Sequence, residues 1–170
     1  AAGIEDMIFV TGRNKRAIPD HFDTAYELEA ELEARGKQET LDLVRNIVPS
    51  HVTCIYLRQS MPLGLGHAVL CAQPVVGDEP FAVILADDLI DDRGRGCVAQ
   101  MVEVFSENNC SILGVERIPR EESSSYGIIA TPDTAGRLVP VEGIVEKPNP
   151  QAPPSDLGVV GRYILTSQIF

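Results

Sequence analysis

The sequence of 170 residues has no tryptophan, only 5% aromatic residues and no long apolar run. A helix that crosses a membrane needs about 20 consecutive apolar residues, so the sequence argues against a membrane protein or a membrane partner. The first residues contain no basic segment followed by an apolar one, and the sequence therefore predicts no signal peptide.

Basic side chains are also scarce. The chain has 14 Lys and Arg against 25 Asp and Glu, which gives a formal net charge of -11. Neutralising the phosphates of DNA or RNA requires a basic face, so we expect no nucleic-acid partner. A small phosphorylated ligand stays compatible with this charge, because a few local cations or a divalent metal ion can hold it.

The few cysteines are widely spaced and form no Cys-x-x-Cys pair; they are Cys54, Cys71, Cys97 and Cys110. This spacing argues against a structural zinc site, and a chain of this size needs no disulfide framework. Each cysteine has apolar neighbours. We therefore expect four reduced core residues in a cytoplasmic protein.

Apolar, β-rich runs alternate with helical patterns along the chain. Strands are expected over residues 7–11, 51–57, 81–85 and 110–115, and helices over 26–35, 41–48, 66–72 and 97–107. Strands separated by helices favour a parallel, doubly wound α/β sheet. After Pro119, strand-like segments over 128–131, 138–146 and 159–165 are separated by turn-forming residues. Both ends of the chain interrupt an expected element, so we expect a piece of a longer protein.

A glycine-containing turn joins the strand over 51–57 to the helix over 66–72. The amide of Gln59 carries an acceptor and donors, and with the N–H of Gly64 it matches the imide edge of uracil or thymine. The alternative is a flexible turn with a surface glutamine. His67 lies beside this turn and either packs against the helix or lines a pocket.

Carboxylates follow the apolar strand over 81–85. Ligands of open α/β sheets bind beyond the carboxyl ends of strands, and a carboxylate there suits Mg²⁺. Asp87 and Asp88 are therefore candidate metal ligands, or else they belong to a solvated loop that caps a helix. Further along, Glu146 suits sugar hydroxyls and Lys147 suits a phosphate, although such a pair is commonly only exposed polar surface.

Five stretches, taken together and in order, resemble the bacterial UTP–glucose-1-phosphate uridylyltransferases, also called UDP-glucose pyrophosphorylases. They are FVTGRNKRAI over 9–18, PLGLGHAVLC over 62–71, FAVILADD over 81–88, VEGIVEKP over 141–148 and VGRYIL over 160–165. The resemblance covers essentially the whole chain. It implies a Rossmann-like nucleotidyltransferase fold with a mostly parallel, doubly wound mixed sheet that is incomplete at both ends. It also implies one truncated domain over 1–170, with a nucleotide-binding half over 1–118 and a sugar-binding half over 119–170.

The resemblance further implies a reaction and its site residues. UTP and α-D-glucose 1-phosphate would give UDP-glucose and pyrophosphate by direct, Mg²⁺-assisted attack on the α-phosphorus, without a covalent enzyme intermediate. The implied roles fall to seven positions: Gln59 and Gly64 read the uracil, Asp87 holds Mg²⁺, Gly127 and Glu146 contact the glucose, Lys147 contacts its phosphate, and Val159 packs against the sugar. The full-length protein is expected to be a homo-oligomer.

Two departures from the family pattern leave alternatives open. The family's N-terminal glycine-rich loop has no counterpart in these residues, and a second metal-binding aspartate is expected downstream of Phe170, so the chain by itself is expected to turn over little substrate. A related thymidylyltransferase, or a catalytically silent sugar-nucleotide-binding fragment, fits the same motifs. An NAD-binding domain is disfavoured because no Gly-x-Gly-x-x-Gly follows the first strand.

Overall fold

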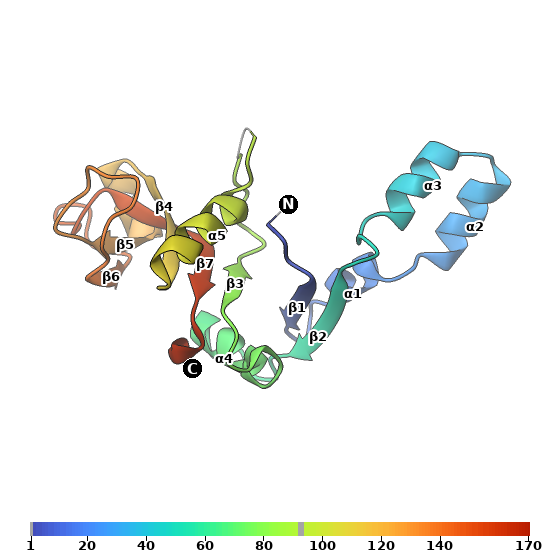
Figure 1. The fold of residues 1–170 in the computed structure, drawn as a ribbon, viewed down its shortest axis with the longest axis horizontal. Helices are drawn as coiled ribbons and strands as arrows, with labels where there is room; N and C mark the ends of the chain where they lie inside the picture. The colour runs from blue at the N-terminus through green and yellow to red at the C-terminus, as the bar shows by residue number, and fades with distance from the viewer. Residues whose placement is uncertain (1, 92–93) are drawn as a thin grey trace. The chain divides into compact units, whose positions relative to one another are not determined.

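The computed structural model describes residues 2–91 and 94–170, which form two compact units (Figure 1). The N-terminal unit contains residues 3–77 together with Phe170, and the C-terminal unit contains residues 78–169 together with Ala2. Each unit has its own sheet and its own helices. The site residues expected from the sequence are therefore distributed over two units.

The N-terminal unit is built on two parallel strands, β1 (Asp6–Thr11) and β2 (Thr53–Arg58). A parallel pair requires a long connection, which three helices supply: α1 (Ala17–Phe22), α2 (Tyr26–Ala34) and α3 (Gln38–Arg45). Figure 1 shows α2 and α3 side by side as a hairpin, and the side chains of Leu32 and Leu41 are buried there. After β2, the helix α4 (Leu65–Val76) returns to pack on both strands.

The C-terminal unit is organised around the long strand β7 (Leu157–Leu165), which pairs with three other strands in antiparallel fashion. These partners are β3 (Phe81–Ile84), β4 (Ile112–Arg117) and β5 (Gly127–Ala130), and β6 (Gly143–Glu146) pairs with β5. The helix α5 (Cys97–Asn108) covers β4 and β7, with Met101, Ile112 and Ile164 in the core between them. The short 3₁₀ helices η1 (Arg120–Ser125) and η2 (Ser167–Ile169) complete this unit.

The expected α/β class is confirmed, but the described strands form a small parallel sheet and a separate antiparallel sheet in place of the expected mostly parallel mixed sheet. Among the described residues, β1 and β2 form the parallel pair, and the other pairings are antiparallel. The reason lies in the connections, because β5, β6 and β7 follow one another without a helical crossover. The strand expected over 138–146 is shorter, Gly143–Glu146, because Pro140 cannot donate a hydrogen bond to a ladder.

The cysteines are less buried than expected. All four are free, with Cys54, Cys71 and Cys97 half-buried and Cys110 exposed. The prediction of a core position is wrong for Cys110, because this residue lies in the turn between α5 and β4 and not in the strand itself.

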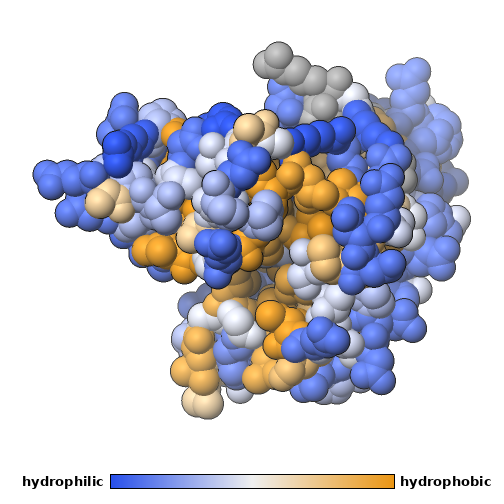
Figure 2. Space-filling model, turned by 60° about the vertical axis from the view of Figure 1, so that its left-hand side comes forward, coloured by the Kyte–Doolittle hydropathy of each residue, from blue (hydrophilic) through white to orange (hydrophobic). Residues whose placement is uncertain are grey.

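Large apolar side chains remain at the surface of both units. Tyr26, Leu43 and Leu89 are the most exposed of those described, and Figure 2 shows apolar side chains gathered among hydrophilic ones on one face. In the described part of the chain, no helix combines the length and the apolar character needed to cross a membrane.

Candidate functional site

The turn that follows β2 is closed by the side chain of Gln59. The Gln59 backbone N–H donates to the carbonyl oxygen of Thr11 at 3.0 Å, which extends the parallel pairing by one residue. Its side-chain Nε2 donates to the carbonyl oxygen of Gly64 at 3.0 Å and lies 2.9 Å from Nδ1 of His67. Gly64 precedes α4 with a φ of 96°, a conformation that glycine adopts without a steric penalty. The structure thus brings Gln59 and Gly64 together and adds His67 to them.

The two neighbouring aspartates after β3 have different surroundings. The Asp87 side chain is exposed, and no hydrogen bond or ion pair engages it within the described ranges. Asp88 is half-buried, and its carboxylate lies against Gly161 of β7, so closely that a Cβ atom at position 161 would overlap it. The Asp87 carboxylate is therefore the more accessible of the two to a ligand.

Arg162 holds the backbone of this aspartate turn. Its Nη1 donates to the carbonyl oxygens of Leu85 and Gly161, both at 3.0 Å, and its Nη2 donates to the carbonyl oxygen of Asp88 at 2.5 Å. The Leu85 N–H donates back to the Gly161 oxygen at 2.9 Å. Gly161 adopts a φ of +62°, so β7 bends at the point where the turn docks. Sequence reasoning missed both Gly161 and Arg162.

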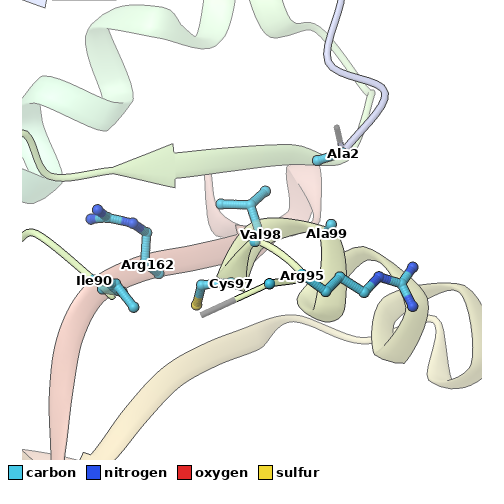
Figure 3. A pocket seen from close by; sticks show the side chains of 9 residues that line it. Ala2, Ile90, Arg95, Cys97, Val98, Ala99 and Arg162 are labelled. Atoms are coloured by element: carbon cyan, nitrogen blue, oxygen red, sulfur yellow. The ribbon is translucent and has the colours of Figure 1, made fainter. Parts of the chain in front are cut away.

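A cavity of about 530 Å³ lies next to Arg162 in the same unit. Figure 3 shows Arg162 and Ile90 together at one end of it and Arg95 at the other. The remaining lining residues are small or apolar and include Cys97 and Val98 of α5. None of the residues that line this cavity was singled out for a site from the sequence.

The residues expected to bind a sugar lie on neighbouring strands. Gly127 of β5 pairs directly with Glu146 of β6, and a Cβ atom at position 127 would lie 3.3 Å from Oε2 of Glu146. Ile128 pairs with Gly158 of β7, so the same register places Val159 next to Gly127. The absence of a side chain at Gly127 thus leaves room for the Glu146 carboxylate beside the strand.

Lys147 follows β6 in an unusual conformation. Its φ of 46° lies in the left-handed region, which residues other than glycine adopt rarely. Its backbone N–H donates to the carbonyl oxygen of Tyr126 at 3.0 Å, which extends the pairing of β5 with β6. The ammonium group is exposed and lies 3.8 Å from Oε1 of Glu146, a loose contact that leaves the charge available to an anion.

Tyr163 lies on β7, the strand that pairs with both β3 and β5. Burial raises the pKa of its phenol, and the negative charges of Asp88 and Glu146 raise this pKa further. The aspartate turn and the strands expected to bind the sugar both belong to the C-terminal unit, whereas Gln59 and Gly64 belong to the N-terminal unit.

Comparison with known proteins places the chain in a family. A family model described as nucleotidyl transferase matches residues 1–170. The chain belongs to the nucleotidyl transferase family. Nucleotidyl transferases of this kind generally use a divalent metal ion. In the described part of this one, no group of three or more His, Cys, Asp or Glu side chains is placed to hold such an ion.

Curated relatives of this nucleotidyl transferase carry one activity in their names. The UTP–glucose-1-phosphate uridylyltransferase YngB of Bacillus subtilis is 46% identical over 99% of this chain and 56% of its own length. The UTP–glucose-1-phosphate uridylyltransferase of Escherichia coli is 45% identical over 100% of this chain and 58% of its own length. The resemblance expected from the motifs is confirmed, and the chain spans little more than half the length of these relatives.

Solved structures agree with this assignment. A UTP-bound UGPase from Acinetobacter baumannii superposes with a TM-score of 0.91 at 41% identity, over 98% of this chain and 60% of that one. A UDP-glucose pyrophosphorylase complexed with UDP-glucose superposes with a TM-score of 0.86 at 42% identity, over 99% of this chain and 61% of that one. The expected nucleotidyltransferase fold is thereby confirmed.

Proposed function

We propose that the protein transfers the uridylyl group of UTP to α-D-glucose 1-phosphate, which gives UDP-glucose and pyrophosphate. Relatives at 43–46% identity bear the name of this activity, and related structures contain UTP or UDP-glucose. The observation that carries the proposal is the pair of free polar groups at the turn after β2. Within the described residues, neither Oε1 of Gln59 nor the N–H of Gly64 has a hydrogen-bond partner.

This pair supports recognition of uracil. Oε1 of Gln59 accepts a hydrogen bond from the imide N3–H of the base, and the Gly64 N–H donates to a neighbouring carbonyl oxygen of the base. The N-terminus of α4, which begins at Leu65, lies directly after Gly64. A glycine at this point lets the base approach the backbone without meeting a side chain, because the space beside its Cα is open.

The strands of the C-terminal unit support binding of glucose 1-phosphate. The Glu146 carboxylate accepts hydrogen bonds from sugar hydroxyls next to Gly127, which adds no side chain of its own, and Val159 supplies an apolar surface for the sugar ring. Lys147 supplies a positive charge for the sugar phosphate. The left-handed conformation of Lys147 supports a functional role, because a strained backbone concentrates at binding sites.

Asp87 fits the role of a Mg²⁺ ligand. Mg²⁺ in nucleotide enzymes is commonly bound by one or two carboxylates together with substrate phosphates and water. The single exposed carboxylate of Asp87 fits this pattern. When bound, the ion offsets the negative charge that builds up on the phosphates. Asp87 supplies an oxygen ligand, and Arg162 keeps the backbone that carries it in place.

The chemistry needs no covalent intermediate. An oxygen of the glucose 1-phosphate attacks the α-phosphorus of UTP, a new phosphorus–oxygen bond forms, and pyrophosphate leaves. The protein contributes mainly by positioning the reactants and stabilising charge.

The proposal is tested with the full-length protein, UTP, glucose 1-phosphate and Mg²⁺. We expect UDP-glucose and pyrophosphate to form in equal amounts. A higher turnover with dTTP than with UTP would identify a thymidylyltransferase instead, and binding of UDP-glucose without any pyrophosphate release would identify a catalytically silent binding protein. Either result contradicts the proposed function.

Three further expectations stay predictions. They are the division into a nucleotide-binding half over 1–118 and a sugar-binding half over 119–170, the homo-oligomeric state of the full-length protein, and the cytoplasmic location. Nucleotide and sugar binding by variants of each half tests the division. Light scattering tests the oligomeric state, and cell fractionation tests the location.

A further inference from the structure

We propose that His67 fixes the orientation of the Gln59 amide and thereby makes the protein select bases that carry an imide N–H, uracil and thymine, over cytosine. The inference rests on the proposed function, because it concerns the base of the nucleotide substrate. His67 acts through Gln59 and is therefore a positioning residue.

The orientation of the amide follows from what surrounds its nitrogen. Nε2 of Gln59 lies 3.0 Å from the carbonyl oxygen of Gly64, and a carbonyl oxygen only accepts hydrogen bonds. The amide nitrogen, and not its oxygen, must therefore face Gly64. The same oxygen also accepts from the N–H of Ala68 at 3.1 Å, so both of its lone pairs are used.

The state of His67 follows in turn. The same Nε2 atom lies 2.9 Å from Nδ1 of His67, and a nitrogen that donates there needs an acceptor. Nδ1 must therefore be unprotonated, and the neutral ring carries its proton on Nε2. Both hydrogens of the Gln59 amide are then used within the protein, and the amide can present only its oxygen to a ligand.

An amide that presents only its oxygen distinguishes between the pyrimidine bases. Uracil and thymine carry a hydrogen on N3, which the Gln59 oxygen accepts, whereas N3 of cytosine is itself an acceptor and would face the oxygen without a proton between them. An amide that turned over would present its NH₂ group and would suit cytosine. Turning it over would place an oxygen against the Gly64 carbonyl oxygen and would require His67 to move its ring proton from Nε2 to Nδ1, so both contacts oppose that change.

The position of His67 suits this role. The residue lies in the first turn of α4, one turn before Cys71, whose Sγ lies 3.9 Å from Nδ1. The His67 ring is half-buried, as is the Gln59 side chain, so water competes only in part for their hydrogen bond. Cys71 touches the same ring without touching Gln59 and offers a matched control.

The test measures how strongly the full-length protein prefers UTP over CTP, as the ratio of their dissociation constants in the presence of Mg²⁺. His67→Leu removes the acceptor, and we expect the preference to fall about threefold to tenfold, the value of one net hydrogen bond. His67→Asn offers an acceptor oxygen at this position and should retain most of the preference, and Cys71→Ala should retain all of it. A general folding defect weakens both nucleotides equally and leaves the ratio unchanged.

A second measurement needs no nucleotide. Nitrogen NMR shifts of the His67 ring should report a protonated Nε2 and an unprotonated Nδ1. A proton on Nδ1 overturns the inference, as does an unchanged preference in His67→Leu when the unmutated protein prefers UTP. An unmutated protein that binds no UTP overturns the proposed function, and the base selection with it.

Discussion

Replacing Arg162 by methionine should loosen the turn that carries Asp87. The guanidinium of Arg162 donates three hydrogen bonds to backbone oxygens, two of them to Leu85 and Asp88 after β3 and one to Gly161 of β7. Methionine has a similar reach and no donor, so the change removes these bonds with little loss of packing.

The expected magnitude follows from this geometry. A hydrogen bond from a charged group contributes about 1.5–3 kcal/mol, but the three bonds share one guanidinium and are not additive. Arg162 is half-buried, so water replaces part of what is lost. We therefore expect the turn to lose about 2–4 kcal/mol of stability against local opening.

Amide hydrogen exchange measures this loss at a suitable place. The Leu85 N–H is bonded to the Gly161 oxygen, so it exchanges when the turn leaves β7. Its exchange should accelerate roughly 30-fold to 900-fold in Arg162→Met, as the free-energy loss implies. Arg162→Lys keeps the positive charge but loses the forked pair of donors. The Leu85 exchange rate in this variant should therefore lie between those of the unmutated protein and Arg162→Met.

Arg95→Met is the matched control in the same unit. Arg95 pairs with Glu103 at an exposed site, and exposed ion pairs contribute about 0–1 kcal/mol. Leu85 exchange should therefore hardly change in this variant. The reasoning fails if the Leu85 N–H of Arg162→Met exchanges at the rate of the unmutated protein. It also fails if Arg95→Met accelerates the exchange of this N–H as much as Arg162→Met does.

Three further predictions concern the same unit. In the full-length protein, Asp87→Asn should remove nearly all turnover at every Mg²⁺ concentration. Asp88→Asn should lower turnover only slightly, because the Asp88 carboxylate faces β7. The opposite result would identify Asp88 as the metal ligand. Lys147→Ala should raise the KM for glucose 1-phosphate about tenfold to a hundredfold and leave the KM for UTP unchanged, and equal losses for both substrates would contradict the role of Lys147. Gly161→Ala should lower the free energy of unfolding in urea titrations by about 2–4 kcal/mol, because Gly161 has a φ of +62° and the added Cβ would overlap Asp88. An unchanged unfolding midpoint would show that the bend at Gly161 is not needed.

The strands were predictable from the sequence because apolar runs mark them directly. The strand expected over 81–85 is observed as Phe81–Ile84, and that expected over 159–165 as Leu157–Leu165. The short helix Ala17–Phe22 was not predicted, since six residues with an internal proline show no helical period. The helix expected over 66–72 continues through Pro74, which lies too near its end to stop it.

The residues proposed to contact a ligand were predictable from the sequence, but the residues that hold them in position were not. Gln59 and Asp87 stand out because an amide or a carboxylate after a strand suits a ligand. Arg162 carries no such signal, because its partners lie 77 and 74 residues away along the chain and meet it only through the pairing of β3 with β7. His67 was visible beside the glycine turn, but its contact with Gln59 depends on how α4 leaves that turn.

The late position of β7 has a consequence for how the chain folds as it is synthesised. β3, β4 and β5 all leave the ribosome before β7, although each of them pairs with it. Their edges stay open until the last residues of the unit emerge, and contacts between residues so far apart form slowly. The N-terminal unit pairs β1 with β2 much earlier, so we expect it to fold first and the C-terminal unit to depend on chaperones in the interval.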